Sequence, residues 1–85
     1  MTVLTVEISL YPLHEDYIPP IKDFISRVNN HADLYVITSA TSTQVCGDYD
    51  VVMDVMHREM KQTHEEIGKA VFVCKFLNLD IRPEQ

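Results

Sequence analysis

Residues 3–11 read VLTVEISLY, the stretch that decides the fold. Apolar side chains at every second position alternate with Thr5, Glu7 and Ser9, which predicts a β-strand with one face against a core. The stretch has no basic residues before it, and Glu7 interrupts its apolar character, so a signal peptide is not predicted. Pro12 ends the strand.

The rest of the chain alternates between helical and strand-like patterns. Two prolines suit the first turn of a helix, where backbone N–H groups have no partner within the helix. Two later segments, rich in β-branched residues and close together, predict a hairpin. The predicted elements, in order, are a helix from Pro19 to Asn30, a hairpin of residues 34–39 and 42–46, a helix after Asp48 that ends at Gly68, and a strand of residues 70–81.

The order βαββαβ in 85 residues predicts one α+β domain spanning residues 1–85. We expect a ferredoxin-like two-layer sandwich, in which both helices cover one face of a four-stranded antiparallel sheet. We further expect the first and third strands to lie side by side and parallel, so that residues 9–13, residues 46–50 and both helix N-termini meet at one edge. The first strand would then separate Cys46 from Cys74 and leave both as free thiols.

Composition and charge narrow the possible partners. The formal net charge is −6 and no cluster of Lys and Arg is visible, which argues against nucleic-acid binding and slightly favours a cationic small molecule. No window is apolar and long enough to span a membrane, and a cytoplasmic protein is expected.

Two helices cover only one face of the sheet. Apolar residues on the other face, such as Val3 and Tyr11, predict a homodimer or a larger homo-oligomer.

The histidines do not form a predicted catalytic or metal site. His57 and His64 are seven residues apart on one helix, whereas helical metal ligands are usually three or four apart, so an exposed helix face is the simpler interpretation. His14 lies in a loop, where it could contact a ligand or only water, and His31 follows the first helix. Because no nucleophile with a positioned base can be assembled, a protein without catalytic activity is predicted.

Polar and aromatic residues gather at the expected shared edge and suggest a binding site. Tyrosine rings can stack on a flat ligand, and hydroxyls and carboxylates can bind its polar atoms or its positive charge. The same acidic residues could instead cap the helices, and the tyrosines could be half-buried packing residues. The predicted ligand-binding residues are Ser9, Tyr11, Tyr17, Thr43, Asp48 and Asp50.

The segments SLYPL (9–13), DYIPPI (16–21) and TSTQVCGDYDVVMDVM (41–56) resemble one repeat of the YkoF-type thiamine/hydroxymethylpyrimidine-binding proteins and the related single-domain thiamine-binding family. This resemblance implies a ferredoxin-like fold without catalysis. It also implies binding of thiamine or its hydroxymethylpyrimidine moiety, as a ligand and not as a cofactor, in thiamine uptake or supply. YkoF-type chains carry two repeats, so a single repeat implies that two chains pair. The alternative is an ACT-like oligomerisation or regulatory module that binds no thiamine.

Overall fold

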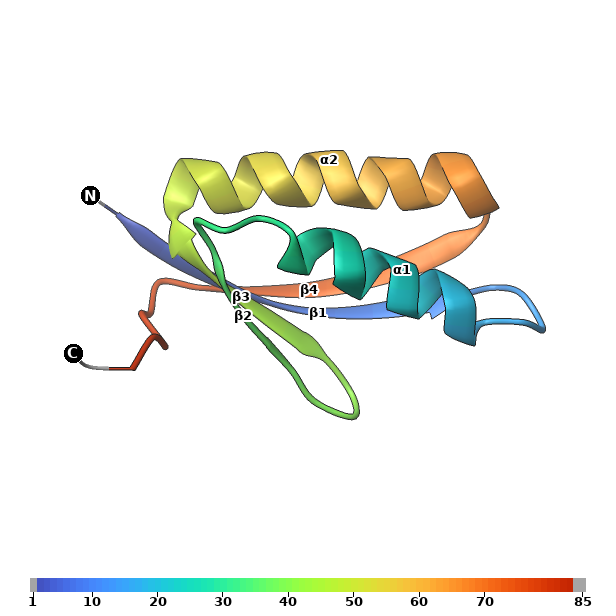
Figure 1. The fold of residues 1–85 in the computed structure, drawn as a ribbon, viewed down its shortest axis with the longest axis horizontal. Coiled ribbons are helices and arrows are strands. Elements are labelled where there is room, and N and C mark those ends of the chain that lie inside the picture. The colour runs from blue at the N-terminus through green and yellow to red at the C-terminus, as the bar shows by residue number, and fades with distance from the viewer. Residues whose placement is uncertain (1, 84–85) are drawn as a thin grey trace.

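The computed structural model describes residues 2–83 and has the predicted βαββαβ order (Figure 1). Both helices lie on one side of a four-stranded antiparallel sheet, which confirms the ferredoxin-like α+β fold. Residues 1, 84 and 85 lie outside the described part of the chain. The elements are β1 (Val3–Pro12), α1 (Ile18–Asn29), β2 (Tyr35–Thr38), β3 (Thr43–Asp48), α2 (Tyr49–Ile67) and β4 (Ala70–Leu77).

The sheet has the strand order β2-β3-β1-β4, and its two central strands run in opposite directions. The expectation that the first and third strands are parallel is therefore wrong. Helix α1 returns the chain so that β2 runs in the direction of β1, and the hairpin then reverses it, so β3 must be antiparallel to β1. As a result α2 begins beside the start of β1, where Tyr49 N–H donates to the Thr2 carbonyl at 2.9 Å, while α1 begins at the other end of the sheet (Figure 1).

The core lies between the sheet and the two helices. Alternate residues of β1 and β3 point into it, and the apolar stripes of both helices cover them. Cys46 and Cys74 are free thiols, as predicted, and β1 lies between the strands that carry them. The buried members of the core are Leu4, Val6, Ile8, Phe24, Val28, Val45, Val52, Val55 and Met56.

Element ends follow local chemistry, with two corrections to the sequence prediction. Gly68, at φ 76°, ends α2 as predicted, and the carboxylate of Asp48 caps its start by accepting from Val51 N–H. The third strand ends at Asp48 and not at residue 46, so it continues through Gly47. Gly47 lies within β3, and the side chain of Leu34 packs where a Cβ atom of a larger residue would be. The last strand ends at Leu77 instead of residue 81.

The chain after β4 turns onto the sheet face away from the helices, which explains the early end of that strand (Figure 1). The Thr5 hydroxyl donates to the Leu79 carbonyl, and the Cys46 thiol donates to Asp80 Oδ1 at 3.5 Å. Hydrogen bonds from the side chain and backbone of Arg82 hold the pKa of Asp80 well below its usual range. Thr5 and Cys46 are buried beneath this segment.

Ending the chain at Leu77 is therefore expected to expose Cys46. In a Cys74→Ser background, reaction of Cys46 with a thiol reagent should accelerate roughly tenfold, corresponding to about 1.4 kcal/mol less protection against local opening. The full-length Cys74→Ser protein is the control. An unchanged rate would mean that the terminal segment does not cover this thiol.

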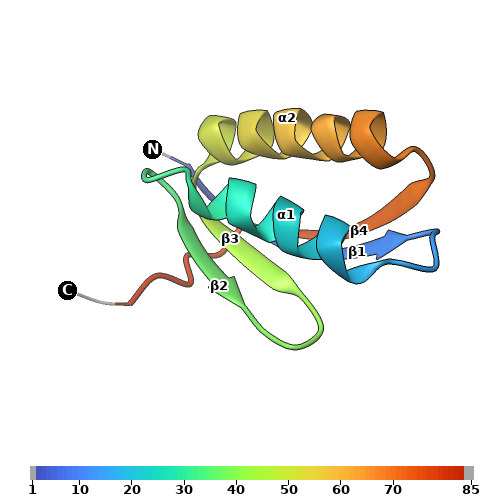
Figure 2. The same cartoon turned by 45° about the vertical axis from the view of Figure 1, so that its right-hand side comes forward.

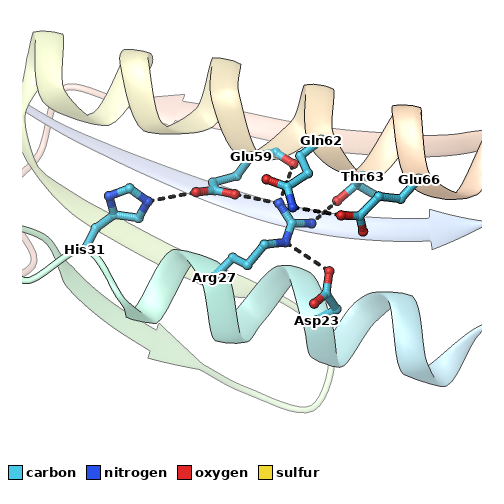
Figure 3. Close-up of polar contacts among 7 residues, drawn as sticks. All are labelled: Asp23, Arg27, His31, Glu59, Gln62, Thr63 and Glu66. Atoms are coloured by element: carbon cyan, nitrogen blue, oxygen red, sulfur yellow. Dashed lines mark hydrogen bonds and ion pairs between the residues drawn. The ribbon is translucent and has the colours of Figure 1, made fainter.

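A polar cluster joins the two helices on the side away from the sheet (Figure 3). Arg27 of α1 lies at its centre and pairs with Asp23 at 2.9 Å and with Glu59 of α2 at 2.5 Å. Its guanidinium also donates to Thr63, and His31 contacts the second carboxylate oxygen of Glu59 at 2.8 Å. Burial acts to raise the pKa of Glu59, but hydrogen bonds from His31 and Arg27 outweigh it and leave that pKa below its ordinary value.

The lowered pKa of Glu59 predicts a loss of stability in acid. A carboxylate with a depressed pKa in the folded state contributes stability that is complete above its unfolded pKa of about 4.3 and is lost as the pH falls through the folded pKa. Urea unfolding measured from pH 7 to pH 3 tests this. Below pH ~4.3 the free energy of unfolding should fall less for Glu59→Gln than for the unsubstituted protein. Parallel curves for the two proteins would contradict this assignment.

Among the described residues, no helix is both long enough and apolar enough to cross a membrane.

Candidate functional site

A pocket of about 430 Å³ lies between the second half of β1, the first turns of α1 and the turn of the β2–β3 hairpin. These three segments lie at the same end of the molecule (Figure 2). The size suits a small organic ligand, since such sites usually measure about 300–1,000 Å³. The lining residues are Ile8, Ser9, Leu10, Tyr11, Pro12, Tyr17, Ile21, Phe24, Ile25, Ser39, Ala40, Thr41, Ser42 and Thr43.

The pocket exists because one edge of β1 is left open. Pairing of β1 with β3 stops at Ile8 opposite Thr43, whereas pairing with β4 continues to Pro12 opposite Ala70. Within the described chain, the stretch 9–12 therefore has no strand beside it on the β3 side. Backbone N–H and C=O groups that point to this side are available to a ligand, because backbone polar groups need a partner.

The structure brings together four of the six predicted site residues. Ser9, Tyr11, Tyr17 and Thr43 all line the pocket. The Ser9 hydroxyl donates to the Thr41 carbonyl at 3.1 Å and so ties β1 to the hairpin turn. Tyr11 and Tyr17 are 55% and 52% exposed, which leaves both rings accessible to a ligand.

Asp48 and Asp50 lie at the opposite end of the sheet from the pocket. Asp48 pairs with Val3 at the start of β1 and caps α2, and Asp50 lies in the first turn of that helix. The predicted edge shared by residues 9–13 and 46–50 is therefore wrong, because β1 and β3 are antiparallel. Helix capping, one of the two sequence interpretations, accounts for Asp48.

Sequence reasoning missed two parts of the lining. The hairpin turn, residues 39–42, contributes hydroxyl groups and was predicted only as a bend. Ile21, Phe24 and Ile25 have the spacing of an apolar helix stripe that packs on a core, yet they also form the apolar side of the pocket. Their helical spacing is the same for either role, so no signal in the sequence separates a core stripe from a pocket wall.

The histidines are placed apart from this site. His14 is exposed and does not line the pocket, and His57 is exposed on α2. His64 contacts the Ala70 carbonyl and forms a T-shaped pair with the ring of Phe72, while His31 belongs to the cluster between the helices. Over residues 2–83, no three His, Cys, Asp or Glu side chains come together as a metal site would require.

The family model that matches this sequence is that of the YKOF-related family, and the match extends over residues 4–78. The chain belongs to the YKOF-related family. The matched range runs from the start of β1 to the end of β4, so it contains every element that builds the pocket. A comparison with curated proteins finds no match.

Three solved structures resemble this member of the YKOF-related family. A protein from Streptococcus pneumoniae has a TM-score of 0.84 at 15% identity, with 93% of this chain and 89% of that chain covered. A candidate thiamine biosynthesis/salvage protein from Thermotoga maritima has a TM-score of 0.80 at 18% identity, covering 94% and 84%. A hypothetical protein from Methanocaldococcus jannascii has a TM-score of 0.80 at 21% identity, covering 100% and 89%. At these identities the likeness establishes the fold.

Proposed function

We propose that this protein binds the hydroxymethylpyrimidine moiety of thiamine, or thiamine itself, without catalysing a reaction, and serves thiamine uptake or supply. The observation that carries the proposal is the pocket at the open edge of β1, where Ser9, Tyr11, Tyr17 and Thr43 gather. The family match and the thiamine-related description of the Thermotoga maritima neighbour support the same ligand class.

The chemistry of the pocket suits an aminopyrimidine. The ring is flat and can stack on an exposed tyrosine, while its amino group and ring nitrogens need hydrogen-bond partners. Hydroxyls of the hairpin turn and the open backbone edge of β1 offer both donors and acceptors. Ile21 and Ile25 form an apolar wall whose chemistry suits the 2-methyl group of the pyrimidine.

Titration calorimetry with hydroxymethylpyrimidine and with thiamine tests the proposal directly. We expect saturable binding with one site per chain. Absence of heat at millimolar ligand would contradict it and would favour the ACT-like oligomerisation module, the second candidate.

A homodimer is proposed through the sheet face opposite the helices. This face carries exposed apolar side chains at one end, and the segment after β4 covers only the other end, over Thr5 and Cys46. Exposed apolar surface of this kind commonly marks an interface. Sedimentation that gives a monomer at micromolar concentration would contradict the proposal. The exposed apolar residues are Tyr11, Ile37, Val71 and Val73.

A further inference from the structure

The pocket lining carries no charged side chain among the described residues. Its polar atoms are serine and threonine hydroxyls, tyrosine hydroxyls and backbone groups, and the rest is apolar. The lining side chain that hydrogen-bonds to a charged group meets a carboxylate: the Ser42 hydroxyl donates to Glu7 Oε2 at 3.2 Å. Lys75 is 3.5 Å from the other oxygen of that carboxylate and is already engaged by it.

The start of α1 borders the pocket but is poorly built for an anion. A helix N-terminus binds phosphate through its free backbone N–H groups, which are those of the first turn. Here two of these positions are Pro19 and Pro20, which have no N–H. Tyr17 at the N-cap makes no side-chain capping bond, so the aromatic ring and not a cluster of N–H donors faces the site.

From this lining we infer that the pocket takes the unphosphorylated form of its ligand and rejects the phosphate ester. The inference rests on the proposed function and specifies its ligand class. A phosphate group carries close to two negative charges at neutral pH. Placed against this lining it would lose water without gaining a cation or a set of N–H donors, beside a carboxylate and on a chain of net charge −6. The protein would therefore handle the free alcohol before any phosphorylation.

Calorimetry with hydroxymethylpyrimidine and its monophosphate, at one ionic strength, tests the inference. We expect the monophosphate to bind at least about 100-fold more weakly than the free alcohol. Equal or tighter binding of the monophosphate would overturn this inference and leave the proposed function intact. Binding of neither compound would overturn both.

A gain-of-function variant gives an independent test. Ala40 lies in the exposed hairpin turn and lines the pocket, so Ala40→Lys should bring a cation to the site and raise the affinity for the monophosphate about tenfold relative to the affinity for the free alcohol. Ala32→Lys is the matched control, because Ala32 is also exposed in a loop but does not line the pocket. An equal gain from both variants would show that net charge, and not the uncharged lining, controls phosphate binding, which would overturn the inference.

Discussion

Replacing Tyr17 with alanine is expected to weaken binding of hydroxymethylpyrimidine roughly 10- to 100-fold. Stacking of a heteroaromatic base on an aromatic side chain contributes about 1–3 kcal/mol. Tyr17 lines the pocket, is 52% exposed and makes no capping bond, so its removal should change the ligand site more than the stability of α1. Calorimetric titration of the variant, with its unfolding temperature measured in parallel, checks both expectations.

Tyr49→Ala is the matched control for this prediction. Tyr49 is similarly exposed, at 43%, and also lies at the start of a helix, but it is at the other end of the sheet from the pocket. Its replacement should leave binding unchanged. Asp50→Asn should also leave binding unchanged, because Asp50 belongs to that same distant end. A larger loss from either control than from Tyr17→Ala would move the site away from the pocket.

Replacing Arg27 with methionine is expected to lower the free energy of unfolding by about 3 kcal/mol. The side chains of Arg27 and Glu59 are only 15% and 12% exposed, and Arg27 also serves Asp23 and Thr63 (Figure 3). Removal of the guanidinium leaves a largely buried carboxylate without its principal cation, which costs far more than the loss of a surface pair. Urea unfolding of the variant at pH 7 measures the change.

Two further variants test whether the loss of unfolding free energy in Arg27→Met comes from the burial of the ion pair or from the loss of a charge alone. Arg58→Met breaks an ion pair of 2.9 Å with Asp54, at side-chain exposures of 57% and 63%, and should cost no more than about 0.5 kcal/mol. The double variant Arg27→Met/Glu59→Met should recover part of the stability lost in Arg27→Met, because it also removes the Glu59 carboxylate, which the single variant leaves largely buried without Arg27. Similar losses for Arg27→Met and Arg58→Met would refute the importance of burial.

The sequence alone determined the kind and order of the elements. The alternation in residues 3–11, the helical stripes and the positions of Pro19, Pro20 and Gly68 are local signals, and each reports on a few neighbouring residues. From these signals the ferredoxin-like fold and the separation of Cys46 from Cys74 were predicted, and the structure confirms both.

Only the tertiary structure decided which ends of the strands meet. The direction of each strand depends on how many times the chain reverses before it. Because the third strand was predicted to run parallel to the first, Asp48 and Asp50 were predicted in the site, whereas they lie at the far end of the sheet. In the structure Thr43 lies near Ser9, because Thr43 begins β3 and pairs with Ile8 in the second half of β1. The open edge of β1 likewise arises from a difference in length between two strand pairings. No local sequence pattern specifies which residues of distant strands pair. This long-range pairing brings the uncharged hairpin turn, β1 and Tyr17 around one pocket.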